Sequence, residues 1–236
     1  MNRRVWVYQK TAMTKTRILL FLFLYFFTFQ VFAQSDDFAT RIGIEIKKDF
    51  KKGFDLSVEY QYRRNQNLSQ FQASFISISP SYKINKHFNT SAEIRYGTSK
   101  TWDRFRYAYY LTAKSTSYKF GYSFRVGYLY ENFLQEVNDI EQFPSTHSMR
   151  IRLLTDYKIN KKLKIALSSE PILSLDNNFN MRQMRNIIEL DYDIFKRQVF
   201  SISYLNIPQF TSNIYTSSNH IIQLKYAFTI TKSNNF

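Results

Sequence analysis

The 236-residue chain contains no cysteine, and it has only five glycines and four prolines. The absence of cysteine excludes a disulfide framework and a thiolate metal site. Acidic residues are also few, with 18 Asp and Glu against 33 Lys and Arg. No long apolar run follows residue 33, and the mean hydropathy of −0.39 argues against a bundle of membrane-spanning helices.

Aromatic residues are abundant instead. The chain has 23 Phe and 18 Tyr, more than an ordinary soluble core of this size needs. Many aromatic side chains combined with a low mean hydropathy fit a wall whose strands alternate lipid-facing and water-facing residues.

The N-terminal segment has the order of a secretory signal. Residues 18–29, ILLFLFLYFFTF, form an apolar run too short to span a bilayer as a helix. Basic residues precede this run and VFA follows it, so we expect a signal peptide at residues 1–33 with cleavage after Ala33. A membrane anchor is the alternative, and either Met1 or Met13 can be the start. Removing residues 1–33 takes away five basic residues, so the net charge of +15 becomes +10.

The remaining chain, residues 34–236, alternates between apolar and polar positions. In FDLSVEYQYR, residues 54–63, every even position is apolar and every odd position is polar. Because side chains alternate across a strand, this pattern gives one apolar and one polar face, whereas a helix would scatter both sets. The pattern predicts a β-strand.

Similar alternation defines eleven runs of strand-like sequence. The runs are 38–48, 54–64, 71–84, 88–97, 104–113, 118–130, 147–159, 163–170, 183–195, 199–207 and 220–230. Most have about the length that a tilted strand needs to cross a bilayer. We therefore predict an all-β fold, an antiparallel transmembrane β-barrel of about 10–12 strands. Because bacterial single-chain barrels have even strand numbers, we expect a missed strand near 171–175 or an irregular first run. A break in the alternation within 71–84 predicts a β-bulge.

A soluble β-sandwich or a lipocalin-like barrel also alternates, but two features favour the membrane barrel. Sandwich loops use Gly and Pro, which are scarce here. The apolar face also carries tyrosines close to the turns or the chain end, where a phenol ring suits the boundary between lipid and water. These tyrosines are Tyr82, Tyr157, Tyr192 and Tyr226.

The connections alternate between two kinds. Short basic connections are expected at 48–53, 85–88, 113–117, 160–163 and 195–198. Longer polar connections are expected at 65–70, 97–103, 131–146, 174–180 and 208–218. The tetrapeptide YKIN occurs twice, at 82–85 and 157–160, two hairpin periods apart. Short periplasmic turns on one rim and longer extracellular loops on the other are typical of outer-membrane barrels.

Several segments resemble a family of Gram-negative outer-membrane proteins catalogued as domain of unknown function 2490. The segments are IGIEIKKDFKKGFDLSVEYQYR, YKINKHFNTSAEIRY, YKINKKLKIAL and the arginine-rich strand WDRFRYAYYLTA. The resemblance extends over nearly all of residues 36–230. It implies an exported outer-membrane barrel, and it transfers no catalytic residues because the family has no established activity.

Charged residues on the polar face of these runs are expected to line the lumen. They are Glu45, Glu59, Glu93, Arg95, Arg104, Arg106, Arg125, Arg150, Arg152, Glu189 and Asp191. Charges held away from bulk water must be paired or hydrated. Two interpretations follow, an ion-pair network that plugs the lumen or a lining that attracts anions into a narrow pore. The plugged lumen implies a structural or binding role, and the narrow pore implies passive transport.

A lipid-modifying hydrolase of the same membrane is the alternative function. Ser145 and His147 share a face, and Ser218 and His220 repeat their spacing. A Ser–His pair needs hydrogen-bond geometry and a third group that orients the imidazole, a role for which Asp139 or Glu141 is within reach.

Other classes of site have little support in the sequence. The three histidines lie in separate segments without ligand spacing, so no metal and no cofactor are expected. The basic residues are dispersed, which argues against nucleic acid. The expected partners are outer-membrane lipids and lipopolysaccharide, together with the barrel-assembly machinery during insertion. The sequence names no small-molecule or ion ligand.

Overall fold

The computed structural model describes residues 37–137, 140–142, 144–176, 178–211 and 214–231. The signal peptide predicted at residues 1–33 lies outside these ranges and stays a prediction. The described residues belong to one compact unit, Asp36–Phe236. Among them, no helix is both long enough and apolar enough to cross a membrane.

The described part of the chain is almost entirely β-strand. The elements are β1 (Asp37–Asp49), η1 (Lys51–Gly53, a 3₁₀ turn), β2 (Phe54–Asn65), β3 (Gln70–Lys83), β4 (Phe88–Thr98), β5 (Trp102–Ser117), β6 (Phe120–Val137), β7 (Ile140–Gln142), β8 (Ser145–Lys158), β9 (Leu163–Ser174), β10 (Met181–Phe195), β11 (Gln198–Thr211) and β12 (Ile214–Thr231). All of these strands belong to one sheet.

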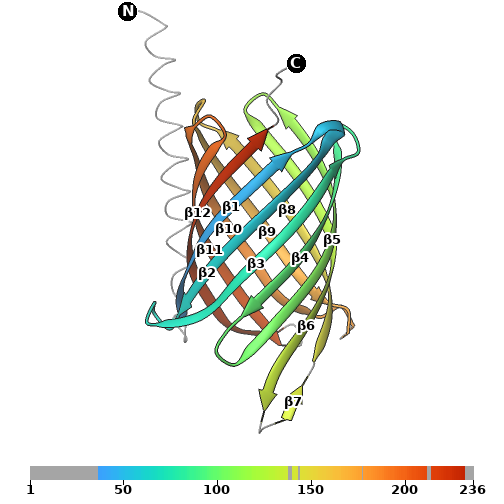
Figure 1. The fold of residues 1–236 in the computed structure, drawn as a ribbon, viewed down its shortest axis with the longest axis vertical. Helices are drawn as coiled ribbons and strands as arrows, with labels where there is room; N and C mark the ends of the chain where they lie inside the picture. Colours follow the sequence, from blue (N-terminus) through green and yellow to red (C-terminus); the bar gives the residue numbers. More distant parts are fainter. Residues whose placement is uncertain (1–36, 138–139, 143, 177, 212–213, 232–236) are drawn as a thin grey trace, which may run out of the picture. The chain divides into compact units, whose positions relative to one another are not determined.

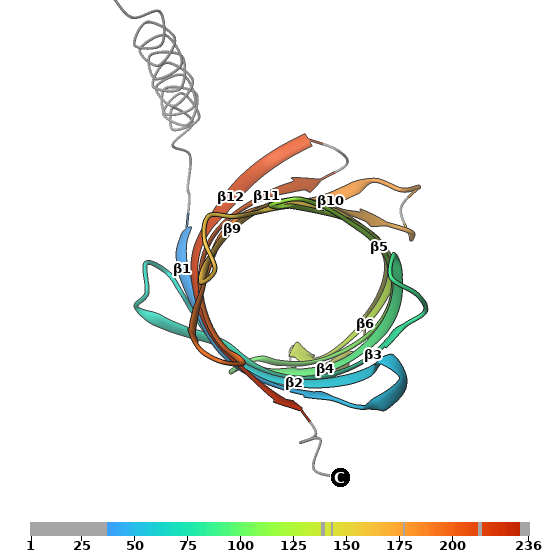
Figure 2. The same cartoon turned by 90° about the horizontal axis from the view of Figure 1, so that it is seen from above.

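Eleven strands close this sheet into a barrel, as Figures 1 and 2 show. Consecutive strands pair around the ring, β6 pairs with β8, and β1 pairs with β12 to complete it. The three-residue β7 pairs only with the far end of β6 and stands outside the ring. The eleven runs found in the sequence therefore correspond to the eleven strands of the barrel.

The seam between β1 and β12 is parallel, whereas the other strand pairs are antiparallel. With an odd number of alternating strands, the first and last must run the same way. Thirteen residue pairs hold this seam, from Asp37 opposite Asn219 to Asp49 opposite Thr231. The expectation of an even strand number is therefore wrong. The segment 171–175, considered as a missed strand, mostly continues β9.

The bulge predicted within 71–84 is present. Arg63 of β2 lies opposite Ala73, but the next residue, Arg64, lies opposite Phe71, so Gln72 is the extra residue. Phe71 then contacts Tyr62, with ring centres 5.4 Å apart, while Phe75 is buried on the other face. The inserted residue thus explains why Phe71 breaks the alternation, whereas Phe75 is an aromatic residue on the inner face.

The outer face of the barrel is apolar. Ile44 and Tyr109, for example, expose 54% and 57% of their surface, and the same row of side chains continues along every strand of the ring. The residues between them turn inward and are largely polar or small. Each strand therefore separates an apolar outside from a polar inside, as its alternating sequence predicts.

The two rims of the barrel differ. Connections at 50–53, 84–87, 118–119, 159–162 and 196–197 form one rim, the short-turn end. The other connections form the long-loop end, which lies at the bottom of Figure 1. Two expected long loops, 131–146 and 208–218, are wrong in part because β6, β11 and β12 extend through most of them. The expected turn at 113–117 likewise belongs to β5.

The repeated YKIN segment forms the same turn twice. The Asn85 side-chain oxygen accepts hydrogen bonds from the backbone N–H groups of His87 and Phe88, at 2.8 and 2.9 Å. Asn160 accepts equivalent bonds from Lys162 and Leu163, at 2.8 and 2.9 Å. An Asn side chain that caps the backbone in this way stabilises a tight turn. The two YKIN segments therefore share one turn structure.

The parallel seam can be tested with engineered cysteines, because the chain has none of its own. Ile44 and Tyr226 are register partners, and neighbouring strands lie about 4.8 Å apart, within disulfide range. We expect Ile44→Cys with Tyr226→Cys to form a disulfide on mild oxidation, detected as a gel-mobility shift that reductant reverses.

The matched control is Ile44→Cys with Phe228→Cys. These positions are displaced by two residues, about 7 Å along the strand, and cannot be bridged without backbone movement. Efficient crosslinking of the control pair, with none in the Ile44/Tyr226 pair, would contradict the register.

Candidate functional site

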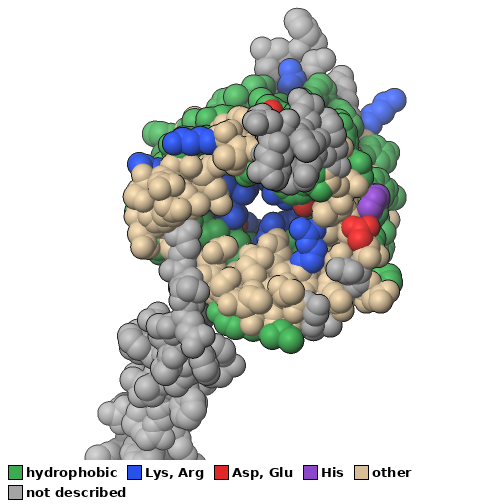
Figure 3. Space-filling view, turned by 90° about the horizontal axis from the view of Figure 1, so that it is seen from below, with side chains coloured by type: hydrophobic (Ala, Val, Ile, Leu, Met, Phe, Trp, Pro, Cys, Tyr) green, Lys and Arg blue, Asp and Glu red, His purple; other side chains and the backbone are tan. Residues whose placement is uncertain are grey.

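The lumen is the candidate functional site, because the polar side chains of all eleven strands converge there. The structure places each of the eleven charged residues predicted to line the lumen on a ring strand, and none of them is exposed. They occupy the face opposite the exposed apolar rows. Viewed from the long-loop end, the barrel has an opening at its centre bordered by Lys and Arg side chains (Figure 3).

One group of charges surrounds Glu131. The register of β5 and β6 sets Arg106 directly opposite Glu131, and their side chains lie 2.6 Å apart. Arg104 also binds the same carboxylate oxygen. Arg106 lies 3.6 Å from Glu93, which pairs with Arg95 at 3.4 Å. Glu131 thus holds two arginines against the wall, where buried ion pairs need additional hydrogen bonds to offset their desolvation.

A second group surrounds Glu170, which is only 2% exposed. Its two oxygens bind Arg150 at 2.6 Å and Arg125 at 2.9 Å, and Arg185 lies 3.6 Å away. Arg150 also donates a hydrogen bond to the Tyr110 hydroxyl at 3.0 Å. One carboxylate therefore organises three arginines from β6, β8 and β10.

Glycines make room for the aromatic side chains that support these arginines. Gly127 lies opposite Tyr110, and a Cβ atom at Gly127 would lie 2.2 Å from the Tyr110 ring. The guanidinium of Arg125 sits over that ring, 4.7 Å from its centre. Gly97 lies opposite Phe75 in the same way. The ring of each aromatic residue thus lies flat along the wall and leaves the lumen open.

The remaining predicted acids lie apart from these two groups. Glu45 binds Lys225 at 3.1 Å, and Asp191 binds Lys164 at 2.9 Å. Glu189 accepts a hydrogen bond from Ser203 at 2.9 Å, while Glu59 lies directly opposite Glu45. No arginine lies within ion-pair distance of these four acids in the described part of the chain. A single network of all the predicted charges is therefore not present.

Several residues that matter here were absent from the predicted lining. They are Arg41, Arg63, Glu131, Glu170, Arg182 and Arg185. Most of them follow the alternation of their strands, so extending the same rule would have found them. Glu131 was instead assigned to a long loop. Strict alternation along β10 would turn Arg182 outward, as it does Ile188. Only the register shift between Met181 and Gln183 explains why Arg182 lines the cavity.

A cavity of about 220 Å³ lies on the inner side of the barrel wall. Six arginines and a single glutamate line it, among other residues. Neither Arg41 nor Arg63 forms an ion pair within the described residues. Arg63 donates a hydrogen bond to Gln61 at 2.6 Å, and its guanidinium lies 4.0 Å from the centre of the Phe75 ring. The cavity therefore has an excess of positive charge, which Glu93 and Glu170 offset only in part among the described residues.

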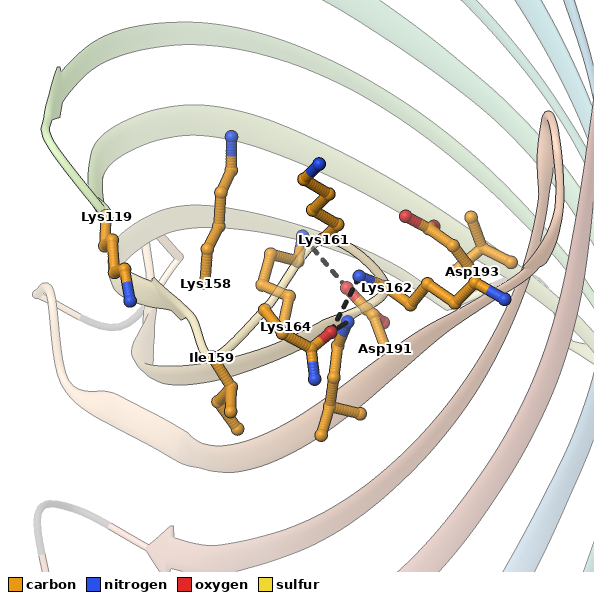
Figure 4. Close-up of a pocket in the computed structure, with 11 residues that line it drawn as sticks. Lys119, Lys158, Ile159, Lys161, Lys162, Lys164, Asp191 and Asp193 are labelled. Atoms are coloured by element: carbon orange, nitrogen blue, oxygen red, sulfur yellow. Dashed lines mark hydrogen bonds and ion pairs between the residues drawn. The ribbon is translucent and has the colours of Figure 1, made fainter.

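A second basic hollow of about 760 Å³ lies at the short-turn end. Figure 4 shows lysines from the turns and strand ends of β6, β8 and β9 around it, with two aspartates of β10. Lys164 is paired with Asp191. The lining lysines are Lys119, Lys158, Lys161, Lys162 and Lys164. This hollow therefore carries an excess of positive charge.

Comparison with known proteins identifies the family. The model described as Protein of unknown function (DUF2490) matches residues 42–218. The chain belongs to this family. A search of curated proteins gives no match.

Solved structures with a similar fold include porins. The NanC porin aligns with 81% of this chain and 99% of its own, with a TM-score of 0.53 and 13% sequence identity. The KdgM porin aligns with 72% of this chain and 91% of its own, with a TM-score of 0.45 and 15% identity, both alone and in complex with disordered oligogalacturonate. At this identity, the NanC likeness is one of fold.

In this DUF2490 member, the histidines of both candidate Ser–His pairs lie beside tyrosine hydroxyl groups. His147 Nδ1 lies 2.5 Å from the Tyr128 hydroxyl, and its backbone N–H donates to Asp176. His220 Nδ1 lies 2.6 Å from the Tyr204 hydroxyl, while Ser218 accepts a hydrogen bond from Asn206. A tyrosine hydroxyl is thus one partner of each imidazole. Asp139 and the side chain of Glu141 lie outside the described residues.

The described residues also contain no group of three His, Asp or Glu side chains that could hold a metal ion. His87 lies in a turn, 3.3 Å from the Lys114 carbonyl oxygen. The guanidinium groups of the lumen can bind and attract anions.

The Glu170 group predicts a large effect of a single charge on stability. Glu170→Gln leaves Arg125, Arg150 and Arg185 without their shared carboxylate. Breaking a buried pair by removing one partner costs about 3–5 kcal/mol, so the free energy of unfolding should fall by that order. Guanidinium-induced unfolding of the protein refolded into lipid vesicles measures it.

The control is Asp193→Asn at an exposed position near the short-turn end. Its effect should remain within about 0.5 kcal/mol. Equal unfolding midpoints for both variants would show that Glu170 does not organise the arginines.

Proposed function

We propose that this protein is an outer-membrane channel of a Gram-negative bacterium, through which small anions pass by diffusion. The observation that carries the proposal is the lumen cavity lined by six arginines and one glutamate. Guanidinium groups without a carboxylate partner attract anions and lower the concentration of cations nearby.

The outer face supports the membrane location. Its exposed apolar rows form a continuous surface that would be costly in water and is suited to lipid. Tyr82 and Tyr192 are outward-facing near the short turns, as expected for an aromatic girdle. We place the short-turn end in the periplasm, where the lysines lie close to lipid phosphates. Insertion by the barrel-assembly machinery and contact with lipopolysaccharide belong to the same proposal.

The open interior supports a pore over a plugged barrel. The Glu131 and Glu170 groups pair their arginines along the strands of the wall, and an opening remains at the centre of the barrel in Figure 3. A plug of paired charges would leave few arginines without partners. Arg41 and Arg63 instead face the cavity without a carboxylate among the described residues.

The membrane location predicts a stability effect on the outer face. Ile94 is 52% exposed and lies mid-strand, so Ile94→Arg should cost about 2–4 kcal/mol if lipid surrounds it. An exposed substitution in a soluble protein usually changes stability by no more than about 0.5 kcal/mol. Unfolding measurements in lipid vesicles decide between these values.

Ile159→Arg is the matched control, because Ile159 lies in a short turn and is 41% exposed. Near the interface the same change should cost only about 0–1 kcal/mol. Equal small costs at both positions would contradict the membrane location.

An anion channel should become less selective for anions when the arginines that have no carboxylate partner among the described residues are replaced. Two unit charges about 10 Å apart in water interact by about 0.4 kcal/mol, with opposite sign for an anion and a cation. Arg41→Gln and Arg63→Gln should therefore each lower the ratio of anion to cation permeability by about two- to fourfold at low salt. The reversal potential across a planar bilayer with a KCl gradient measures this ratio.

Arg197→Gln, in an exposed turn, serves as the control and should leave the reversal potential unchanged. A wild-type channel that prefers cations, or a protein that inserts and conducts no current, would refute the proposed function.

A further inference from the structure

Arginine and glutamate occur four residues apart on the inner face of three strands near the seam. The strands β1 and β10 run toward the short-turn end, and β2 runs away from it. On all three, the glutamate is therefore the residue nearer the short-turn end, by about 13 Å along the strand. The pairs are Arg41 and Glu45 on β1, Arg63 and Glu59 on β2, and Arg185 and Glu189 on β10.

The arginines of these pairs belong to a larger group that we name the arginine tier. Four of its members line the cavity described above, and the other two join them through a shared glutamate, Arg95 through Glu93 and Arg150 through Glu170. Glu93, Glu131 and Glu170 neutralise part of this charge. The arginine tier consists of Arg41, Arg63, Arg95, Arg106, Arg150 and Arg185.

The glutamates form a second group around one lysine, the acidic tier of Glu45, Glu59, Glu189 and Lys225. Lys225 binds Glu45 at 3.1 Å and interacts with Glu59 and Glu189 through its charge. A Cβ atom at Gly43 would lie 3.6 Å from the Lys225 side chain and 3.7 Å from Glu59, so both flank the same position. Three carboxylates and one ammonium give these four residues a net charge of −2. Arg152 and Lys164 also interact with Glu189, and Lys164 is paired with Asp191, so the net charge is −1 when these three neighbours are included.

We propose that the two tiers form a charge junction that makes the channel rectify, so that its current depends on the sign of the voltage. This inference rests on the proposed anion channel. Mobile anions collect in the arginine tier and mobile cations in the acidic tier. When the short-turn side is positive, both are driven toward the boundary between the tiers, and the current is larger. The opposite voltage draws both away from the boundary and depletes it.

The acidic tier also sets the barrier for an anion that has reached the arginine tier. Lys225 lowers this barrier, because it neutralises one of the three carboxylates. Removing a carboxylate and removing the lysine should therefore have opposite effects on the same current. Opposite changes in the current indicate an electrostatic role. A general loss of structure would change the current in the same direction in both variants.

Single-channel recording in planar bilayers at low salt tests the junction. A cysteine at Lys86→Cys, in a short turn, reports which side of the membrane that end occupies through reaction with an impermeant thiol reagent. For the parent channel we expect a larger current when the short-turn side is positive. About 1 M salt, at which charges are screened within about 3 Å, should remove the difference.

The variants act on the acidic tier alone. The combination Glu59→Gln and Glu189→Gln keeps the side-chain shapes, and it should make the currents at the two polarities equal and keep the preference for anions. Lys225→Gln should increase the difference between the polarities and reduce the anion current.

An anion-selective parent channel with equal currents at both polarities would overturn the junction and leave the proposed function standing. So would unchanged asymmetry in the Glu59→Gln, Glu189→Gln variant. A parent that prefers cations or conducts no current would instead overturn the proposed function, and the junction with it.

Discussion

A strand sends successive side chains to opposite sides, and closing a sheet turns those sides into an inside and an outside. The architecture of this protein depends on that constraint. Closure also pairs every ring strand with two neighbours, so no unpaired edge remains along the wall. Alternation then allows an apolar outer surface and a charged interior to coexist in a wall one strand thick. Neither a helix nor an open sheet could separate the two environments so completely.

The number of strands is odd because the first strand begins at one end of the barrel and the last strand ends at the other. Eleven alternating strands force β1 and β12 to run in the same direction, so the barrel closes through a parallel seam. The strand end at Asp37 then lies at the long-loop end, and the strand end at Thr231 lies at the short-turn end. The seam also brings Glu45 and Lys225 together, although they are 180 residues apart in the sequence. The acidic tier exists because of this closure.

Much of the fold could be predicted from alternation, because the rule needs only neighbours in the sequence. The run at 54–63 shows both faces of β2, and the failure of the rule around Phe71 locates a real bulge. The parallel seam could not be predicted in this way. It depends on the number of strands, which we expected to be even by analogy with other bacterial barrels.

The candidate site was harder to predict, because alternation gives the face of a residue and not its partner. Arg150 was expected in the lumen, but its partner Glu170 lies on the next strand at a position set by register and tilt. Glu131 was assigned to a loop, since nothing local shows that β6 continues to Val137. Arg182 reaches the cavity only through a register shift. Partners across a barrel require three-dimensional information that one strand does not contain.

The central claim is that water occupies the inside of this barrel and lipid its outside, and thiol labelling tests it directly. Single cysteines can be placed along β2 in an otherwise cysteine-free chain reconstituted in lipid vesicles. We predict that a small water-soluble thiol reagent modifies cysteines at Ser57 and Glu59 and spares those at Val58 and Tyr60. Rapid modification at Val58 and Tyr60 by the same reagent would contradict it.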